Sequence, residues 1–196
     1  MFRFIGGPAR CGKSTLLQKA SRQYDGELIS LDNLRSSYLA IVSDEMRLQL
    51  KPNASIKDNT VDEWIDILRK RDRLLWDGAK GYLEAAAANH DDVMMEGCVW
   101  PDYADELTGE FRAVYVVDTS AEHVDRIIAA ARNEATHNNW MKDRDEAWLR
   151  QWAEYNIERS KLYVELAKKY NQPVFDVGEL GFEEAQARAL RYLFES

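Results

Sequence analysis

The segment RFIGGPARCGKSTLLQKA, residues 3–20, decides the fold of this chain. Gly7 is followed by four residues and then by Gly12-Lys13-Ser14, which is the G-x-x-x-x-G-K-[ST] pattern of a phosphate-binding loop, or P-loop. The pattern is informative only where a strand precedes it and a helix follows it. Here the apolar run of residues 2–5 predicts a buried strand, and residues 14–24 predict a helix with one apolar side. The segment therefore predicts nucleotide binding.

The residue types of this loop suit it to bind phosphate. Glycines at both ends allow backbone angles that turn N–H groups inward, and the helix that follows adds the positive end of its dipole. The Lys13 ammonium can reach the β- and γ-phosphates, and the Ser14 hydroxyl can ligate Mg²⁺. The predicted nucleotide-binding residues of the loop are Gly7, Ala9, Arg10, Cys11, Gly12, Lys13, Ser14 and Thr15. The Cys11 thiol has two interpretations, simple loop filling and redox sensing.

The composition indicates one soluble domain, residues 1–196, with a net charge of -8. That acidic balance argues against nucleic acid as the main partner, because phosphate backbones require clustered Lys and Arg. The two cysteines, Cys11 and Cys98, lie far apart and form no disulfide framework. No apolar run is long enough to span a membrane. We expect a cytoplasmic protein without a membrane partner.

Strands and helices alternate along the chain. The expected strands cover residues 2–5, 27–31, 92–96, 113–117 and 172–177, and the expected helices cover residues 14–24, 33–42, 61–90, 121–132, 147–170 and 182–194. This alternation predicts an α/β fold with a parallel sheet that has helices on both faces.

The longest predicted helix, residues 61–90, carries two informative acidic residues. Thr60 and Glu63 form the pattern of a capping box, which marks the helix start. Asp72 interrupts the apolar stripe of the same helix. We favour an Asp that pairs with a neighbouring Arg at the edge of the stripe, and the alternative is a polar group that lines a substrate pocket.

Other motifs exclude two classes of P-loop protein. The N-K-x-D segment with which GTPases read their base is absent, since the fourth predicted strand ends in VVDTS. Motor ATPases and transporters need a hydrophobic strand that ends in Asp-Glu, and DVMMEG, residues 92–97, lacks that pair.

Five short motifs accompany the predicted strands: GGPARCGKST, ISLDNLR, MMEG, DRIIAAAR and PVFDVGEL. Through them the chain resembles, over essentially its whole length, the small P-loop kinases of the nucleoside-monophosphate-kinase-like group. Within that group it is similar to hydroxyl kinases with an Asp after the second strand: 2-phosphoglycerate-kinase-like proteins, zeta-toxin-like kinases and the kinase domain of polynucleotide kinases. The resemblance implies a three-layer P-loop NTPase fold with strand order 2-3-1-4-5, a substrate-binding helical region at about 33–90 and a lid at about 133–147.

The resemblance also implies an acceptor site near Asp32. This residue follows the second strand at the sheet edge where open α/β sheets bind ligands, and its carboxylate can accept the proton of an attacking hydroxyl. An alternative is that Asp32 caps the helix that begins at Asn33. Arg35 supplies an anion anchor, and Glu96, at the position of a Walker B carboxylate, holds Mg²⁺ through water. Trp100 is either a pocket wall or a core residue.

Two arginines are implied to act at the lid. Arg126 resembles the Arg that stacks on adenine, and Arg132 resembles the lid arginines that neutralise the transferring phosphoryl group. Residues 176–180, DVGEL, are implied to back the adenine. The predicted catalytic residues are therefore Lys13, Asp32, Arg35 and Arg132.

The sequence favours a kinase that uses ATP and Mg²⁺ to phosphorylate a hydroxyl of a small molecule. The alternatives are a polynucleotide 5'-hydroxyl kinase and a nucleotide-binding module without catalysis. The acidic balance and the lack of a basic stripe with interleaved aromatics favour a small-molecule acceptor. The sequence names neither the acceptor nor the oligomeric state.

Overall fold

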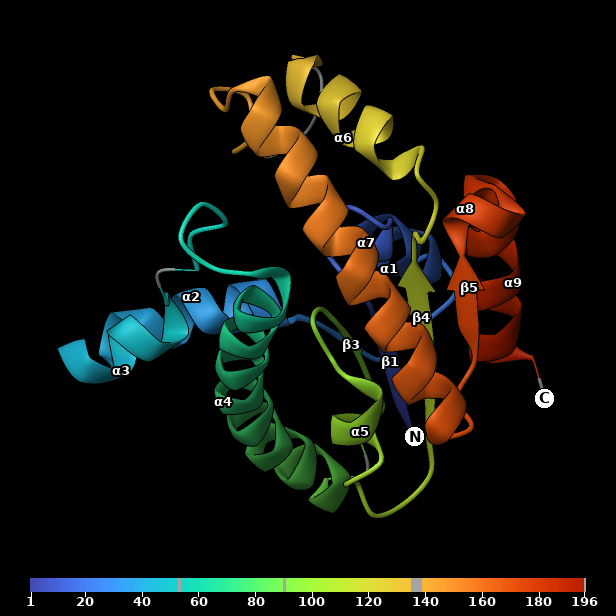
Figure 1. The fold of residues 1–196 in the computed structure, drawn as a ribbon. Coiled ribbons are helices and arrows are strands. Elements are labelled where there is room, and N and C mark those ends of the chain that lie inside the picture. Colours follow the sequence, from blue (N-terminus) through green and yellow to red (C-terminus); the bar gives the residue numbers. More distant parts are fainter. Residues whose placement is uncertain (53, 90, 135–138, 196) are drawn as a thin grey trace.

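Five parallel strands form the centre of the fold in the order β2-β3-β1-β4-β5, and β4 lies beside β5 in Figure 1. The computed structural model describes residues 1–196 except 53, 90, 135–138 and 196. The strands are β1 (Phe2–Gly6), β2 (Glu27–Ser30), β3 (Val93–Glu96), β4 (Phe111–Val117) and β5 (Val174–Asp176). The predicted fold class and the implied strand order are both confirmed.

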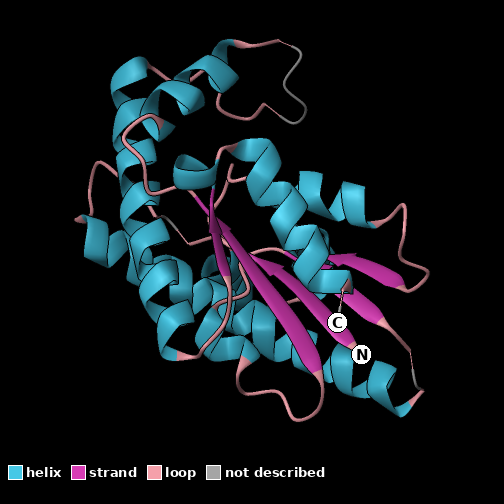
Figure 2. Ribbon diagram, turned by 90° about the vertical axis from the view of Figure 1, so that its right-hand side faces the viewer, coloured by secondary structure: helices cyan, strands magenta, loops and turns pink. Residues whose placement is uncertain are grey.

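Helices cover both faces of this sheet (Figure 2). The described helices are α1 (Lys13–Ala20), α2 (Leu31–Ile41), α3 (Asp44–Leu50), α4 (Val61–Ala88), α5 (Pro101–Ala104), α6 (His123–Arg132), α7 (Glu146–Lys169), α8 (Val177–Leu180) and α9 (Phe182–Phe194). Each strand sends alternate side chains to opposite faces. Phe4 therefore joins the core under α4 and α7, while Ile5 joins the core under α1 and α9.

Most helix boundaries follow from local signals. The capping box of Thr60 and Glu63 is present at the start of α4 and confirms that prediction. Helix α3 has no counterpart among the predicted elements, although Ser43 caps it by accepting a hydrogen bond from the Met46 N–H at 3.3 Å. Helix α2 begins at Leu31, two residues before the predicted Asn33, with Ser30 at the N-cap position.

The carboxyl edge of the sheet has helices on several sides (Figure 1). In Figure 1, α6 and the amino-terminal end of α7 lie above the end of β4, whereas α2 and α3 extend to the left, away from β5 and α9. In parallel α/β sheets this edge is where ligands bind. Among the described helices, none is both long and apolar enough to cross a membrane.

Candidate active site at the carboxyl edge of the sheet

The P-loop connects β1 to α1 with backbone angles that require glycine. Gly7 has a φ of 132° and Gly12 a φ of 94°, both outside the range that L side chains commonly adopt. A Cβ at Gly7 would lie 2.1 Å from the Val116 carbonyl oxygen, and one at Gly12 would lie 2.7 Å from the Phe182 ring. Gln186 of α9 donates a hydrogen bond from Nε2 to the Gly12 carbonyl at 3.2 Å. The last helix thus supports the loop.

Lys13 is a buried cation in this loop. Its side chain folds back so that Nζ donates to the Pro8 carbonyl at 2.6 Å, and the residue is 8 % exposed. Within the part of the chain that the structure describes, Lys13 makes no ion pair with a carboxylate. Ser14 is exposed and Thr15 is half-buried at the start of α1. The P-loop therefore contains a buried ammonium that, among the described residues, is bonded to a backbone carbonyl and not to an anion.

The Cys11 thiol is buried in the same loop. Burial is the main cause that raises the pKa of Cys11 to about 12, and it outweighs the opposing effect of Lys13. The thiol is therefore protonated near neutral pH, and its Sγ lies 3.7 Å from the Ala9 carbonyl oxygen. These observations favour loop filling over redox sensing.

Glu96 ends β3 next to the P-loop strand. It pairs in register with Ile5 of β1 on one side and with Ser30 of β2 on the other, and it is 5 % exposed. Its Oε1 accepts a hydrogen bond from Ser30 Oγ at 2.8 Å. The ion pairs of the described residues do not include Glu96. A carboxylate this deeply buried ordinarily requires a cation, so this residue fits the predicted role at Mg²⁺.

Asp32 and Arg35 lie in the first turns of α2, just beyond β2. Their side chains form an i,i+3 ion pair at 3.4 Å, and the Asp32 side chain is 76 % exposed. Ser30, and not Asp32, occupies the N-cap, so the capping interpretation of Asp32 is wrong. The Nε of Arg35 is buried without a hydrogen-bond partner. This helix start thus presents an accessible carboxylate beside an unsatisfied donor.

A buried charge cluster that the sequence did not reveal lies between α4 and α7. Both oxygens of Asp72 are occupied: Oδ1 accepts from Arg71 Nε at 2.8 Å, and Oδ2 accepts from Arg159 Nη2 at 2.8 Å and from Trp100 Nε1 at 3.0 Å. Asp72 and Arg159 are 1 % and 2 % exposed. The expected pairing of Asp72 with a neighbouring Arg is present, but in the core and not at the edge of the stripe.

Trp100 belongs to this cluster as a core residue. It is fully buried and stacks on Tyr163 with ring centroids 4.1 Å apart. The Arg159 guanidinium lies 5.2 Å from the Trp100 ring, which adds a cation–π contact. One feature of the sequence could have indicated this cluster. Arg159 lies four residues before Tyr163, on the face of α7 that the helix buries.

Asp118 forms a second buried cluster at the end of β4. Its Oδ2 faces His123 Nδ1 at 2.9 Å and accepts from Arg126 Nε at 3.1 Å and Nη2 at 2.5 Å. Its Oδ1 accepts from Ser120 Oγ at 2.8 Å. These hydrogen bonds, from His123 first and then from Arg126, overcome burial and lower the pKa of Asp118 to about 2. Arg126 is thus held by a fully ionised carboxylate.

Arg132 lies at the end of α6, in contact with the segment that leads to α7. Its guanidinium donates to the carbonyls of Lys142 and Arg144, both at 3.0 Å. Asn139 Nδ2 donates to the carbonyls of residues 130, 131 and 133, and Met141 is fully buried. Of the predicted lid, residues 135–138 lie outside the described residues. The contribution of Arg132 to phosphoryl transfer stays a prediction. In this structure its guanidinium binds the backbone of the segment that leads to α7.

Two surface grooves are lined by residues outside the P-loop. One of about 540 Å³ is lined by Gln49, Asp66, Arg69, Lys70, Arg73, Leu74 and Tyr103. Another of about 670 Å³ is lined by Thr119, Lys161, Val164, Glu165, Val174, Phe175, Asp176, Glu179, Leu180 and Arg188. The second includes part of the DVGEL segment and runs along β5 and α7. Neither groove contains the buried charges described above, so the residues at the sheet edge define the candidate site.

No protein-family model matches the sequence, and no curated protein matches it. Among solved structures, a shikimate kinase from Bacteroides thetaiotaomicron superposes with a TM-score of 0.58 at 15% sequence identity, over 100% of this chain and 99% of that chain. A candidate kinase from Chloroflexus aurantiacus j-10-fl is also 15% identical, with a TM-score of 0.45 over 82% of this chain and 78% of that one. The first similarity shows that this chain has a shikimate-kinase-like P-loop fold.

Proposed function

We propose that this protein is a kinase that transfers the terminal phosphoryl group of ATP to a hydroxyl of a small molecule with the help of Mg²⁺. One observation carries the proposal. Lys13 and Glu96 are buried charges of opposite sign at the same sheet edge, and among the described residues neither has a counter-ion. A polyphosphate would neutralise the ammonium, and a divalent cation would neutralise the carboxylate.

On the donor side, the P-loop backbone and Lys13 would bind the β- and γ-phosphates. The exposed Ser14 hydroxyl and Glu96, the latter through water, would hold Mg²⁺, which when bound reduces the charge on the phosphates. Arg126 would stack on the base with the guanidinium face that Asp118 leaves free.

On the acceptor side, Asp32 would act as the general base. Its exposed carboxylate can take the proton of the acceptor hydroxyl while the hydroxyl oxygen bonds to the γ-phosphorus. The bond from that phosphorus to the β–γ bridging oxygen then breaks, and ADP leaves with the electron pair. Arg35, whose Nε has no partner, would orient the acceptor or the transferring group.

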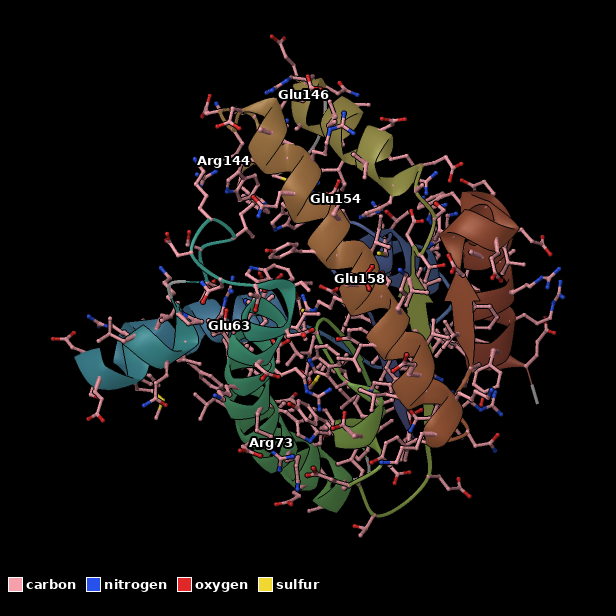
Figure 3. All side chains as sticks on the ribbon, viewed as in Figure 1. Glu63, Arg73, Arg144, Glu146, Glu154 and Glu158 are labelled. Carbon is pink, nitrogen blue, oxygen red and sulfur yellow. The ribbon has the colours of Figure 1, made fainter. Side chains whose placement is uncertain are left out.

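The charge of the surface supports a small acceptor over a polynucleotide. Glu146 and Glu158 are exposed on α7 (Figure 3) and pair with Arg150 and Lys161 of the same helix, so the surface of this helix carries charges of both signs and no basic stripe. The whole chain carries a net charge of -8. This net negative charge disfavours a nucleic acid backbone, which needs clustered Lys and Arg, and it therefore favours a small acceptor.

Donor binding is tested by isothermal titration calorimetry with Mg·ATP on the wild type, Lys13→Ala and Lys168→Ala. Lys13→Ala should weaken binding by at least about 100-fold, because it removes the buried cation that faces the phosphates. Lys168→Ala, which removes an exposed Lys near the end of α7, should bind as the wild type does. Equal binding by all three proteins would overturn the donor assignment.

Acceptor chemistry is tested by a screen for ADP release with glycerate derivatives, nucleosides, aminoglycosides and 5'-hydroxyl oligonucleotides. With the acceptor that turns over, Asp32→Asn should bind Mg·ATP normally and lose transfer by about 100-fold or more. Asp44→Asn, an exposed acid in the first turn of α3, is the matched control. Full activity of Asp32→Asn would show that the base assignment is wrong, and turnover of oligonucleotides alone would establish the polynucleotide alternative.

A further inference from the structure

The Arg126 side chain is held in one orientation by groups at the end of β4. Asp118 Oδ2 accepts from its Nε and its Nη2, and Ser120 Oγ accepts from the same Nη2 at 2.6 Å. The Arg126 side chain is nevertheless 46% exposed. A long flexible cation at a surface ordinarily samples many rotamers, so three hydrogen bonds to one edge of the guanidinium are a strong constraint.

Asp118 itself cannot move easily. Its side chain is 3% exposed, and it accepts from the backbone N–H and the hydroxyl of Ser120. His123, 1 % exposed, contacts the same carboxylate through Nδ1, and a carboxylate that only accepts requires a proton on that nitrogen. The anchor of Arg126 is therefore a fixed and fully hydrogen-bonded anion.

The same loop is also tied to the segment after β5. Thr119 donates from its backbone N–H and its hydroxyl to Asp176, and Gly178 donates its N–H to Asp176 Oδ1 at 2.8 Å. Gly178 packs so closely on Ser120 that a Cβ there would lie 2.6 Å from the Ser120 Cβ. The loop that carries the Arg126 anchor and the DVGEL segment thus form one cross-linked frame.

We propose that Asp118 is a positioning residue that presets Arg126 for the nucleotide base, with Asp176 fixing the facing segment. The inference rests on the proposed function, in which Arg126 stacks on the base. An arginine already held in its binding orientation loses less conformational entropy when the ligand arrives, and this preorganisation raises affinity. The benefit applies only to ligands with a base, because the phosphates contact the P-loop and not Arg126.

The test compares two ligands, Mg·ATP and inorganic tripolyphosphate with Mg²⁺, by isothermal titration calorimetry. Asp118→Asn should weaken the binding of Mg·ATP by roughly 3- to 10-fold, because the Arg126 side chain loses its constraint. The affinity for tripolyphosphate should not change. Arg126→Ala should show the same selectivity for Mg·ATP. The double variant should bind Mg·ATP no more weakly than Arg126→Ala, because Asp118 acts through Arg126.

Asp125→Asn is the matched control, since it removes the same charge from an exposed neighbouring position on α6 and should bind both ligands normally. If Asp118→Asn does not fold, Ser120→Ala replaces it as the test. This substitution removes the other side chain that accepts from Arg126, and it should weaken the binding of Mg·ATP but not that of tripolyphosphate. Wild-type affinity for Mg·ATP in the folded variants, or equal weakening of both ligands, would overturn the inference. Failure of the proposed function would look different, because the wild type itself would then bind neither ligand.

Discussion

Two groups of buried charges lie close together in this molecule and differ in how they are balanced. Asp72 is bonded by two arginines and a tryptophan, so its oxygens have no place for a ligand. Lys13 and Glu96 are almost as buried, but within the described residues Lys13 donates only to a neutral carbonyl and Glu96 accepts only from a neutral hydroxyl. Desolvating a charge is costly unless a partner compensates. We infer that the first group stabilises the fold, and the proposed function assigns the second group to ligand binding.

The first test of this difference is substitution of Asp72, where we expect the largest change in the free energy of unfolding. Asp72→Ala should lower the free energy of unfolding by about 3–5 kcal/mol, because it leaves Arg71 and Arg159 buried without their anion. Chemical denaturation measures the change. Asp66→Ala, at an exposed position on the same helix, should change it by less than about 0.5 kcal/mol. Equal effects of the two substitutions would show that the Asp72 cluster does not stabilise the fold.

Glu96 is expected to behave in the opposite way. Glu96→Gln should change the free energy of unfolding by less than about 1 kcal/mol, because it removes a buried charge that has no cationic partner. The same variant should need about 10- to 100-fold more Mg²⁺ for half-maximal binding of ATP, since it loses a carboxylate close to the metal. Titration of Mg²⁺ at fixed ATP measures this shift. An unchanged Mg²⁺ requirement would remove Glu96 from the metal site.

The contribution of the buried Asp118 carboxylate to stability should depend on pH. Its pKa is about 2 in the folded protein, against about 3.9 for an unfolded Asp, so ionised Asp118 contributes about 2.6 kcal/mol of stability above about pH 5. This contribution should disappear as the pH falls from about 4 to about 2. The stability difference between the wild type and Asp118→Asn should therefore shrink over that window. A difference that stays constant with pH would show that the Asp118 pKa is not lowered by folding.

The fold followed from the sequence because its signals are local. The P-loop pattern, the alternation of strands and helices, and the Thr60–Glu63 capping box each depend on residues within a few positions of one another. Helix α3 was missed because seven mainly polar residues carry little periodic signal. The carboxyl-edge location of Glu96, Asp32 and the P-loop followed from strand order, which came from the resemblance.

The charge clusters could not be predicted because they join residues far apart in the sequence. Asp72 and Arg159 are 87 positions apart, and only packing of α4 against α7 brings them together. Asp72 was expected to pair with a neighbouring Arg, and it does so with Arg71, but no residue near Asp72 in the sequence indicated that its second partner is Arg159 of α7. Whether Asp32, Arg35 and Arg132 act in catalysis stays a prediction, because transfer geometry depends on bound substrates.

The contact between the last helix and the first loop has a consequence for synthesis of the chain. Gly12 leaves the ribosome early, but the Phe182 ring and Gln186 that support it belong to α9. Arg3 of β1 likewise donates to the Leu193 carbonyl at 3.1 Å. A nascent chain that stalls before α9 therefore carries the whole P-loop sequence without its support. Nucleotide affinity should therefore be acquired only after α9 has been made and has packed against the P-loop.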